Sequence, residues 1–175
     1  MNFDKDVYPA VYSNCEKVKL IPVENARGCN FRCEFCIHPI KSGNYREKSI
    51  NELMEELDVL NKKYGFINFY ACGSNTSHKF CIDILKKVYE KGNDYILSFF
   101  QSARDFNIEN RDILSKANVG FFWIGIETAS QDIAKNQIKN HKKISDSELV
   151  CKLLNEIGIR HYDSYIFRLS SKVCG

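Results

Sequence analysis

Apolar positions along the chain alternate between short continuous runs and longer stretches with helical spacing. The continuous runs are rich in aromatic and β-branched residues and predict five strands. Pro22 lies within the first run and counts against a strand there, because proline cannot donate a hydrogen bond to the ladder. The predicted strands cover residues 18–26, 66–72, 95–100, 121–126 and 160–167.

Helical spacing occupies the intervals between these runs. Ser49 and Glu52 have the spacing of a capping box before the first helix, and Ser145 and Glu148 repeat it before the last. Gly65 and Gly158 are placed to end those two helices. The apolar stripes predict helices over residues 50–64, 80–88, 109–117, 130–138 and 149–157.

The repeated strand–helix order predicts a parallel sheet with right-handed crossovers. The strand interiors are apolar enough to suggest an α/β fold, a partial parallel (β/α) barrel of about five βα units. A complete eight-unit barrel needs about 250 residues, and the chain has 175. We therefore expect an incomplete, truncated barrel over residues 18–169, an N-terminal extension over 1–17 and a tail over 170–175.

Composition and charge narrow the function classes. Apolar residues make up 44% and charged residues 27%, which indicates a globular chain. The net charge of +3 argues against a dedicated nucleic-acid binder. No stretch approaches the roughly 20 apolar residues of a membrane helix. The N-terminus has no apolar signal core, so a cytoplasmic location is expected.

Eight cysteines are many for this length. Without a signal peptide they indicate metal binding or catalysis rather than a disulfide framework. Cys29, Cys33 and Cys36 form a C-x3-C-x2-C cluster directly after the first predicted strand, where a barrel of this type places its active-site loops. The scattered remainder are Cys15, Cys72, Cys81, Cys151 and Cys174.

Three thiolates on one loop can hold three corners of a cubane iron–sulfur cluster and leave the fourth iron open. Zinc is the competing metal, and structural zinc would need a fourth ligand, for which Cys15 and His38 are the candidates. The third interpretation is three reduced thiols with no metal.

The cysteine spacing, with aromatic Phe35 before the last cysteine, resembles the signature of the radical S-adenosylmethionine (radical SAM) superfamily. Residues 24–33 are similar to the strand-and-loop segment of its cobalamin-type and oxygen-independent coproporphyrinogen oxidase-like members. Gly125 to Ser130 resembles the strand-four segment G-I-E-S-G-S. Tyr165 to Leu169 stands where many relatives have an apolar strand ending in G-L-P-G.

The resemblance implies that Cys29, Cys33 and Cys36 ligate a [4Fe-4S] cluster. S-adenosylmethionine would chelate the open iron, and one electron from the reduced cluster would cleave it to a 5′-deoxyadenosyl radical. The substrate is unknown, with methyl or methylthio transfer suggested by analogy, and the reductant would be a protein such as flavodoxin or ferredoxin. Cobalamin is a further candidate cofactor, although the 17 residues before strand one cannot form a cobalamin-binding domain.

The resemblance also implies a set of S-adenosylmethionine-binding residues near the strand ends. The loop after strand two often reads G-G-E-P in the family, whereas here it reads Ala71 to Asn75 without carboxylate or proline. Gly73 could be a plain turn glycine, and Glu127 a solvated loop acid. The implied binding residues are Phe35, Gly73, Ser98, Gln101, Gly125, Glu127 and Arg168.

Two other function classes stay open. The chain could be a truncated, non-catalytic module that binds a cluster or zinc and transfers electrons or recruits a partner. It could also be an α/β scaffold without metal. Cleavage of S-adenosylmethionine separates an enzyme from the module, and an iron assay identifies the scaffold.

Overall fold

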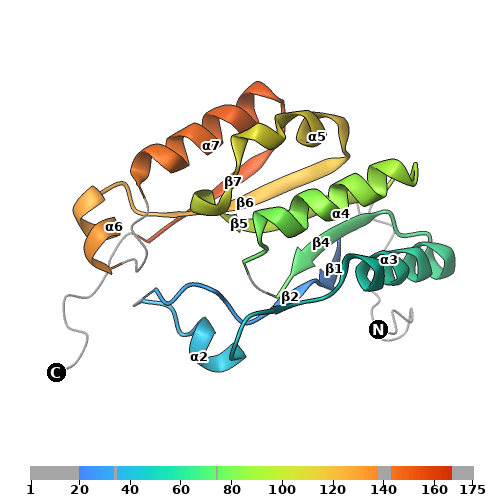
Figure 1. Cartoon of the computed structure of the whole chain (residues 1–175), viewed down its shortest axis with the longest axis horizontal. Helices are drawn as coiled ribbons and strands as arrows, with labels where there is room; N and C mark the ends of the chain where they lie inside the picture. Colours follow the sequence, from blue (N-terminus) through green and yellow to red (C-terminus); the bar gives the residue numbers. More distant parts are fainter. Residues whose placement is uncertain (1–19, 34, 74, 138–142, 167–175) are drawn as a thin grey trace, which may run out of the picture.

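A five-stranded parallel sheet forms the centre of the molecule. The computed structural model describes residues 20–33, 35–73, 75–137 and 143–166 (Figure 1). The strands follow one another across the sheet in chain order, and two shorter strands, β2 (Ala26–Arg27) and β3 (Arg46–Glu47), form a separate sheet. The strands in sheet order are β1 (Ile21–Glu24), β4 (Asn68–Cys72), β5 (Ile96–Ser102), β6 (Val119–Glu127) and β7 (His161–Tyr165).

The helices gather on one face of this sheet. Right-handed crossovers between successive parallel strands bring the connecting helices to the same side. Figure 1 shows α3, α4, α5 and α7 along the sheet, with α6 at its left and α2 at the lower left, below β2. The helices are α2 (His38–Ser42), α3 (Ile50–Tyr64), α4 (His78–Glu90), α5 (Arg111–Lys116), α6 (Gln131–Gln137) and α7 (Ile144–Glu156).

Shorter elements complete the described chain. Two 3₁₀ turns follow β5, and none of the helices among the described residues is long and apolar enough to cross a membrane. The two turns and the two-stranded antiparallel sheet are η1 (Ala103–Asp105), η2 (Ile108–Asn110), β2 (Ala26–Arg27) and β3 (Arg46–Glu47).

The hydrophobic core lies between the sheet and the helices. Phe69, Phe99 and Phe122, one from each of three adjacent strands, are completely buried, and the rings of Phe99 and Phe122 stack with centroids 5.6 Å apart. Leu57 of α3 and Ile84 of α4 pack against them from the helix layer. Because successive strand residues point to opposite faces, these residues define the covered face of the sheet.

The opposite face carries aromatic residues that stay partly exposed. Tyr70 stacks on Phe121 at 5.8 Å, and Phe121 meets the edge of Tyr162 at 5.3 Å. Trp123 is 43% exposed and Tyr162 46%. A parallel sheet with helices on one face and this second face open is a partial (β/α) barrel, which confirms the predicted fold class.

The sequence signals for α3 are confirmed. The Ser49 hydroxyl accepts a hydrogen bond from the Glu52 amide at 3.2 Å, and Glu52 Oε2 accepts one from the Ser49 amide at 2.8 Å, which completes the capping box. Gly65 ends the helix in a left-handed conformation, with φ at 69° and its amide donating to the Asn61 carbonyl.

The second predicted capping box is wrong. Helix α7 begins at Ile144, and its N-cap is Lys143, which makes no side-chain capping bond. The Ile144 amide donates to Gln131 Oε1 at 3.2 Å, so a side chain from α6 caps the first turn of α7 in place of Ser145. A tertiary contact here replaces the local cap.

The first strand is shorter than predicted. β1 ends at Glu24, and Ala26–Arg27 leaves the main sheet to pair with Arg46–Glu47. Pro22 is exposed within β1, which is an edge strand of this sheet, the position where a missing N–H is tolerated. The predicted extension over 1–17 and the tail over 170–175 lie outside the described residues.

Candidate metal centre

The cysteine segment, residues 28–45, is a loop whose two ends are held together by backbone hydrogen bonds. The β2–β3 pair joins Ala26 to Glu47 and Arg27 to Arg46. The Lys48 amide donates to the Asn25 carbonyl at 2.9 Å, and the Asn25 amide donates to the Cys72 carbonyl at 3.2 Å. These backbone bonds fix both ends of the segment beside the carboxyl ends of β1 and β4.

Gly28 makes this closure sterically possible. Its φ is +75°, a conformation that residues with a side chain rarely adopt. A Cβ atom here would lie 2.4 Å from the Asn44 carbonyl oxygen and 2.6 Å from that of Gly43. The backbone of Gly43 and Asn44 therefore packs directly against Gly28, the residue before Cys29.

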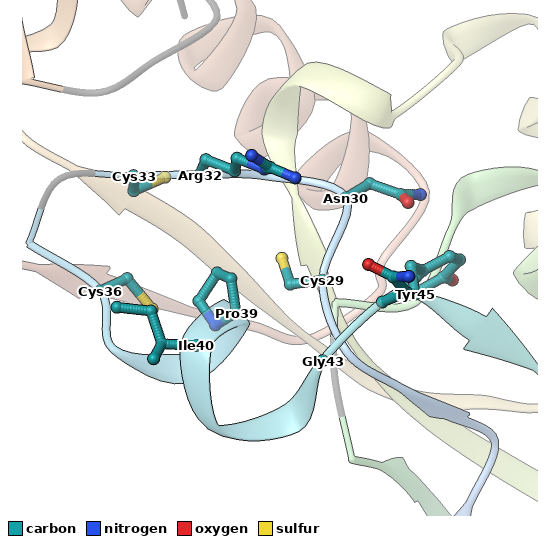
Figure 2. A pocket seen from close by; sticks show the side chains of 10 residues that line it. Cys29, Asn30, Arg32, Cys33, Cys36, Pro39, Ile40, Gly43 and Tyr45 are labelled. Carbon is teal, nitrogen blue, oxygen red and sulfur yellow. The ribbon is translucent and has the colours of Figure 1, made fainter.

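The three clustered cysteines line one pocket of about 480 Å³. Figure 2 shows Cys29 on one side of this space and Cys33 and Cys36 on another, with helix α2 below them. Among the described residues that line the pocket, these are the only thiol, imidazole or carboxylate side chains. The lining residues are Cys29, Asn30, Arg32, Cys33, Cys36, Pro39, Ile40, Gly43, Asn44 and Tyr45.

One backbone amide donates a hydrogen bond to a clustered sulfur. The Phe31 amide donates to Cys29 Sγ at 3.4 Å, and a backbone bond from the Cys36 amide to the Cys33 carbonyl, at 3.1 Å, joins the other two cysteines. Hydrogen bonds to ligating sulfurs are one of the means by which proteins tune iron–sulfur clusters. The Arg104 guanidinium lies 5.8 Å from the Phe31 ring centroid, which adds positive charge near the segment.

The donor set fits a cluster better than a single zinc ion. Ligands of a single ion lie close together, and among the described residues the three cysteine sulfurs are not found within 4.8 Å of one another. They are therefore too widely spaced, as they stand, to bind one ion. His38 does not line the pocket, and its Nδ1 is 3.2 Å from Ser42 Oγ. Cys15 lies outside the described residues. Three spaced thiolates with no fourth metal ligand among the described lining residues match a cubane with one open iron.

A triad of polar residues, Tyr45, Glu47 and Ser77, links the lining of the pocket to the start of helix α4 through hydrogen bonds. The Tyr45 hydroxyl donates to Glu47, and Ser77 Oγ donates to Glu47 Oε1 at 2.6 Å. The Ser77 amide donates to Tyr45 Oη at 3.3 Å, and Ser77 also caps α4 by accepting from the Phe80 amide. Burial, followed by the bond to Glu47, raises the pKa of Tyr45, so its hydroxyl stays protonated at neutral pH.

Among the predicted cofactor-binding residues, Gly73 follows β4 and packs against the base of the cysteine segment. Its φ is +112°, and a Cβ there would lie 2.3 Å from the Ala26 carbonyl oxygen. Glu24 lies beside it and forms a two-oxygen ion pair with Arg27, at 2.7 and 2.8 Å. Gly73 thus lets two strand-end loops approach each other closely.

Ser98 and Gln101 on β5 are completely buried. Ser98 lies against Gly120 of the next strand, where a Cβ would meet its hydroxyl oxygen at 2.5 Å. Gln101 donates from Nε2 to the Thr76 carbonyl at 3.2 Å, and its Oε1 lies 3.5 Å from His78 Nδ1. Gln101 thus lies beneath the loop after β4, whereas Ser98 lies near the start of β5, and neither residue lines the cysteine pocket.

Gly125 and Glu127 lie at the carboxyl end of β6, where the ladder with β7 shifts register. Glu127 has φ at 69°, the one non-glycine residue with positive φ among the described residues. Its carbonyl accepts a hydrogen bond from the Ile166 amide at 2.8 Å. A Cβ at Gly125 would lie 2.8 Å from Glu127 Oε1, so the carboxylate lies over that glycine.

Phe35 and Arg168 are the two remaining predicted residues. Phe35 is 36% exposed on the cysteine segment, and Arg168 lies outside the described residues. Of the residues predicted to bind metal or cofactor, the structure brings the three cysteines into one pocket. It places Gly73, Gly125 and Glu127 at strand ends along the same edge of the sheet.

The sequence interpretation did not include Asn25, Thr76 and Tyr45. Asn25 and Thr76 are completely buried, and Asn25 Nδ2 donates to Thr76 Oγ1 at 3.0 Å across the ends of β1 and β4. For Thr76 the available signal was position, because it is a polar residue in the loop after the second predicted strand. Asn25 fell inside the first predicted strand and Tyr45 well beyond it, so position marked neither of them.

Comparison with known proteins extends these observations. A model of the Radical SAM superfamily matches residues 23–168. The ribosomal protein uS12 methylthiotransferase RimO of Campylobacter fetus is 25% identical over 141 residues, which cover 75% of this chain and 32% of that protein. The corresponding protein of a Hydrogenobaculum species is 27% identical over 154 residues, which cover 83% and 37%. The chain thus spans about a third of the length of these curated relatives.

A solved structure shares the fold. The radical S-adenosylmethionine methyltransferase TsrM from Kitasatospora setae superposes with a TM-score of 0.76 at 18% identity, covering 87% of this chain and 31% of that one. At this identity the likeness concerns the fold. The match to the family model takes in most of the chain and includes all three clustered cysteines, and on that ground the chain belongs to the radical SAM superfamily.

Proposed function

We propose that the chain holds a [4Fe-4S] cluster on Cys29, Cys33 and Cys36, binds S-adenosylmethionine beside it and cleaves it reductively. The observation that carries the proposal is the pocket in which these three cysteines meet without another metal-ligand side chain among its described lining residues. Membership of a superfamily whose relatives here are methyltransferases and methylthiotransferases supports it.

The protein's own groups would prepare this pocket for a cluster. The cysteines ligate as thiolates, and the Phe31 amide donates to Cys29 Sγ. Asn30 and Asn44 line the same space and offer amide groups for hydrogen bonds. When bound and reduced, the cluster supplies the single electron that cleaves S-adenosylmethionine and yields a 5′-deoxyadenosyl radical.

The strand ends would bind S-adenosylmethionine. Gly73 keeps the loop after β4 close to the base of the cysteine segment, where its backbone can approach a ligand. Glu127 holds its carboxylate over Gly125 from a strained backbone, and strain of this kind tends to occur where a ligand is positioned. Gln101 would act from below by holding the loop at Thr76, and the roles of Ser98, Phe35 and Arg168 remain predictions.

The reaction class we propose is transfer of a methyl or methylthio group to an unidentified substrate, by analogy with the relatives. Reduction would come from a protein electron donor such as flavodoxin or ferredoxin. A TsrM structure contains cobalamin together with its cluster, so added cobalamin belongs among the conditions tested.

The test is electron paramagnetic resonance of the anaerobically reconstituted chain, reduced with dithionite, before and after addition of S-adenosylmethionine. We expect a [4Fe-4S]⁺ signal that changes on addition, followed by 5′-deoxyadenosine detected by chromatography. Alanine variants of the three cysteines should lose the signal. Cys72→Ala is the matched control, because Cys72 lies near the segment but outside the pocket lining, and it should keep the signal.

Each other outcome has a definite meaning. Zinc in place of iron would overturn the cluster proposal. A cluster signal that ignores S-adenosylmethionine would overturn the enzymatic part and support the electron-transfer module. Loss of the signal in Cys72→Ala as well would contradict the assignment of the three ligands.

A further inference from the structure

A second group of metal-ligand side chains lies away from the cysteine pocket, on the covered face of β7. Cys151 of α7 and His161 and Asp163 of β7 place one ligand atom each within 4.8 Å of the others. In the strand ladder His161 pairs with Phe122 and Asp163 with Ile124, both core residues. His161 and Asp163 therefore face the helix layer, where α7 supplies the thiol.

The separations between these atoms suit tetrahedral coordination. Cys151 Sγ lies 3.7 Å from Asp163 Oδ1, and His161 Nδ1 lies 3.0 Å from the same oxygen. Zinc bonds of about 2.3 Å to sulfur and 2.0–2.2 Å to nitrogen or oxygen, at tetrahedral angles, give edges of roughly 3.6 and 3.4 Å. The side chains would need to move by a few tenths of an ångström, well within rotamer adjustment.

The chemistry of the three side chains points to one class of ion. The side chains of His161 and Asp163 are 13% and 26% exposed, although Asp163 as a whole residue is exposed, and Cys151 is half-buried. Thiolate and imidazole favour zinc over magnesium or calcium, which prefer oxygen ligands. Three protein ligands leave one position of a tetrahedron for an exchangeable ligand.

We propose that Cys151, His161 and Asp163 form a zinc site that fastens the edge strand β7 to helix α7. Strand β7 has a ladder partner on one side only, β6, among the described residues. A metal bond from the strand to its covering helix would resist the fraying to which an edge strand is prone. The site shares no residue with the cysteine pocket, so it is independent of the cluster.

Cobalt(II) tests the site directly, because tetrahedral thiolate-bound cobalt absorbs in both the visible and the near ultraviolet. The full chain would carry Cys29→Ala, Cys33→Ala and Cys36→Ala, which removes the cluster ligands. We expect a thiolate-to-cobalt band at one equivalent, reversed by excess zinc. Adding Cys151→Ser should abolish that band, and His161→Gln or Asp163→Asn should weaken binding at least about tenfold.

Glu148→Gln is the matched control, since Glu148 is an exposed acid on the same helix α7 and outside the group. It should leave cobalt binding unchanged. No thiolate band, or a band that survives Cys151→Ser, would overturn the proposal.

A second measurement avoids dependence on the folding of the triple variant. The chain with intact cluster cysteines, purified with zinc present, should contain one zinc per chain more than its Cys151→Ser variant by mass spectrometry, and only the unsubstituted chain should gain thermal stability from this additional zinc. Equal zinc content in both chains would overturn the proposal. Because the two chains have the same cluster cysteines, any zinc bound there cancels in the difference, and the outcome is independent of whether the cluster proposal holds.

Discussion

The cysteine segment and the helix-covered core are held together in different ways. In the core, Leu57, Ile84 and Phe99 are completely buried and pack across the sheet and two helices. In the cysteine segment, helix α2 has no buried residue, and Ile37 and Ile40 are 59% and 83% exposed. Backbone contacts and the Tyr45–Glu47–Ser77 triad hold the segment instead. Fold stability and cluster chemistry therefore depend on separate residues, which substitutions can separate.

The largest expected effect is in the core. Leu57→Ala should lower the free energy of unfolding by about 2–5 kcal/mol, because it leaves a cavity among tightly packed neighbours. Urea denaturation with and without a reconstituted cluster measures it. Val59→Ala on the same helix is the control, since Val59 is 60% exposed and should change stability by less than about 0.5 kcal/mol. Equal losses for the two variants would contradict the assigned core.

A smaller effect on stability, with a larger one on the cluster, is expected at Gly28. Gly28→Ala combines positive φ with a Cβ 2.4 Å from the Asn44 carbonyl oxygen. The left-handed backbone alone costs about 1–2 kcal/mol for an alanine. Iron per chain after reconstitution should fall well below that of the unsubstituted chain, while the urea midpoint moves less than in Leu57→Ala.

Gly43→Ala separates backbone strain from collision. Gly43 has φ at +69°, but a Cβ there meets nothing within 4 Å. Its iron content should lie between those of Gly28→Ala and the unsubstituted chain. The same iron content in both variants would show that the close crossing at Asn44 is unimportant for the cluster.

At the end of β6 we expect an effect on ligand binding with little effect on folding. Gly125→Ala would displace the flexible Glu127 carboxylate, which lies 2.8 Å from the new Cβ position. If that carboxylate contacts S-adenosylmethionine, Gly125→Ala and Glu127→Gln should each weaken its binding about tenfold, equivalent to about 1.4 kcal/mol. Equilibrium dialysis with the cluster-loaded chain measures this, and unchanged affinity in both variants would remove Glu127 from the site.

The smallest effect concerns a partly exposed group of hydrogen bonds that links Asp58 of α3 to the residues just before β5. Asp58 accepts hydrogen bonds from Tyr95 at 2.8 Å and from Lys91 at 3.2 Å. Burial raises the pKa of Asp58, but these hydrogen bonds outweigh it and hold the pKa below its usual value. The carboxylate therefore contributes stability above the unfolded pKa near 4, and this contribution disappears as pH falls through the lower folded pKa.

Asp58→Asn should accordingly cost about 0.5 kcal/mol at neutral pH, a value typical of exposed pairs. The difference from the unsubstituted chain should vanish in strong acid. Denaturation curves across the acid range check both statements, and a difference that grows on acidification would show that the sign of the shift is wrong.

Much of the fold could be predicted from sequence because burial imposes periodicity. The apolar stripe from Ile50 to Tyr64 and the glycine that follows it predicted α3, and the structure has that helix over the same residues. The start of α7 was not predictable in this way. Gln131 serves its first amide from a different helix, and such a contact leaves no mark on local spacing.

The site could be predicted only in part, for a similar reason. The cysteines have a specific spacing, and the structure gathers them in one pocket. The two-residue pair β2–β3 joins residues about 20 positions apart. In the triad, Ser77 lies 30 positions from Glu47 and 32 from Tyr45 and bonds to each of them once. Contacts so short and so distant in sequence have no periodic signature.

Pro22 makes the two outer strands of the sheet unequal. In β1, a strand of four residues, one residue has no N–H to offer, whereas β7 contains no proline over its five residues. An additional strand, whether from another chain or from an extended peptide, would lose a donor beside β1 but not beside β7. An added strand should therefore pair more readily with β7, the edge that carries His161 and Asp163, than with β1.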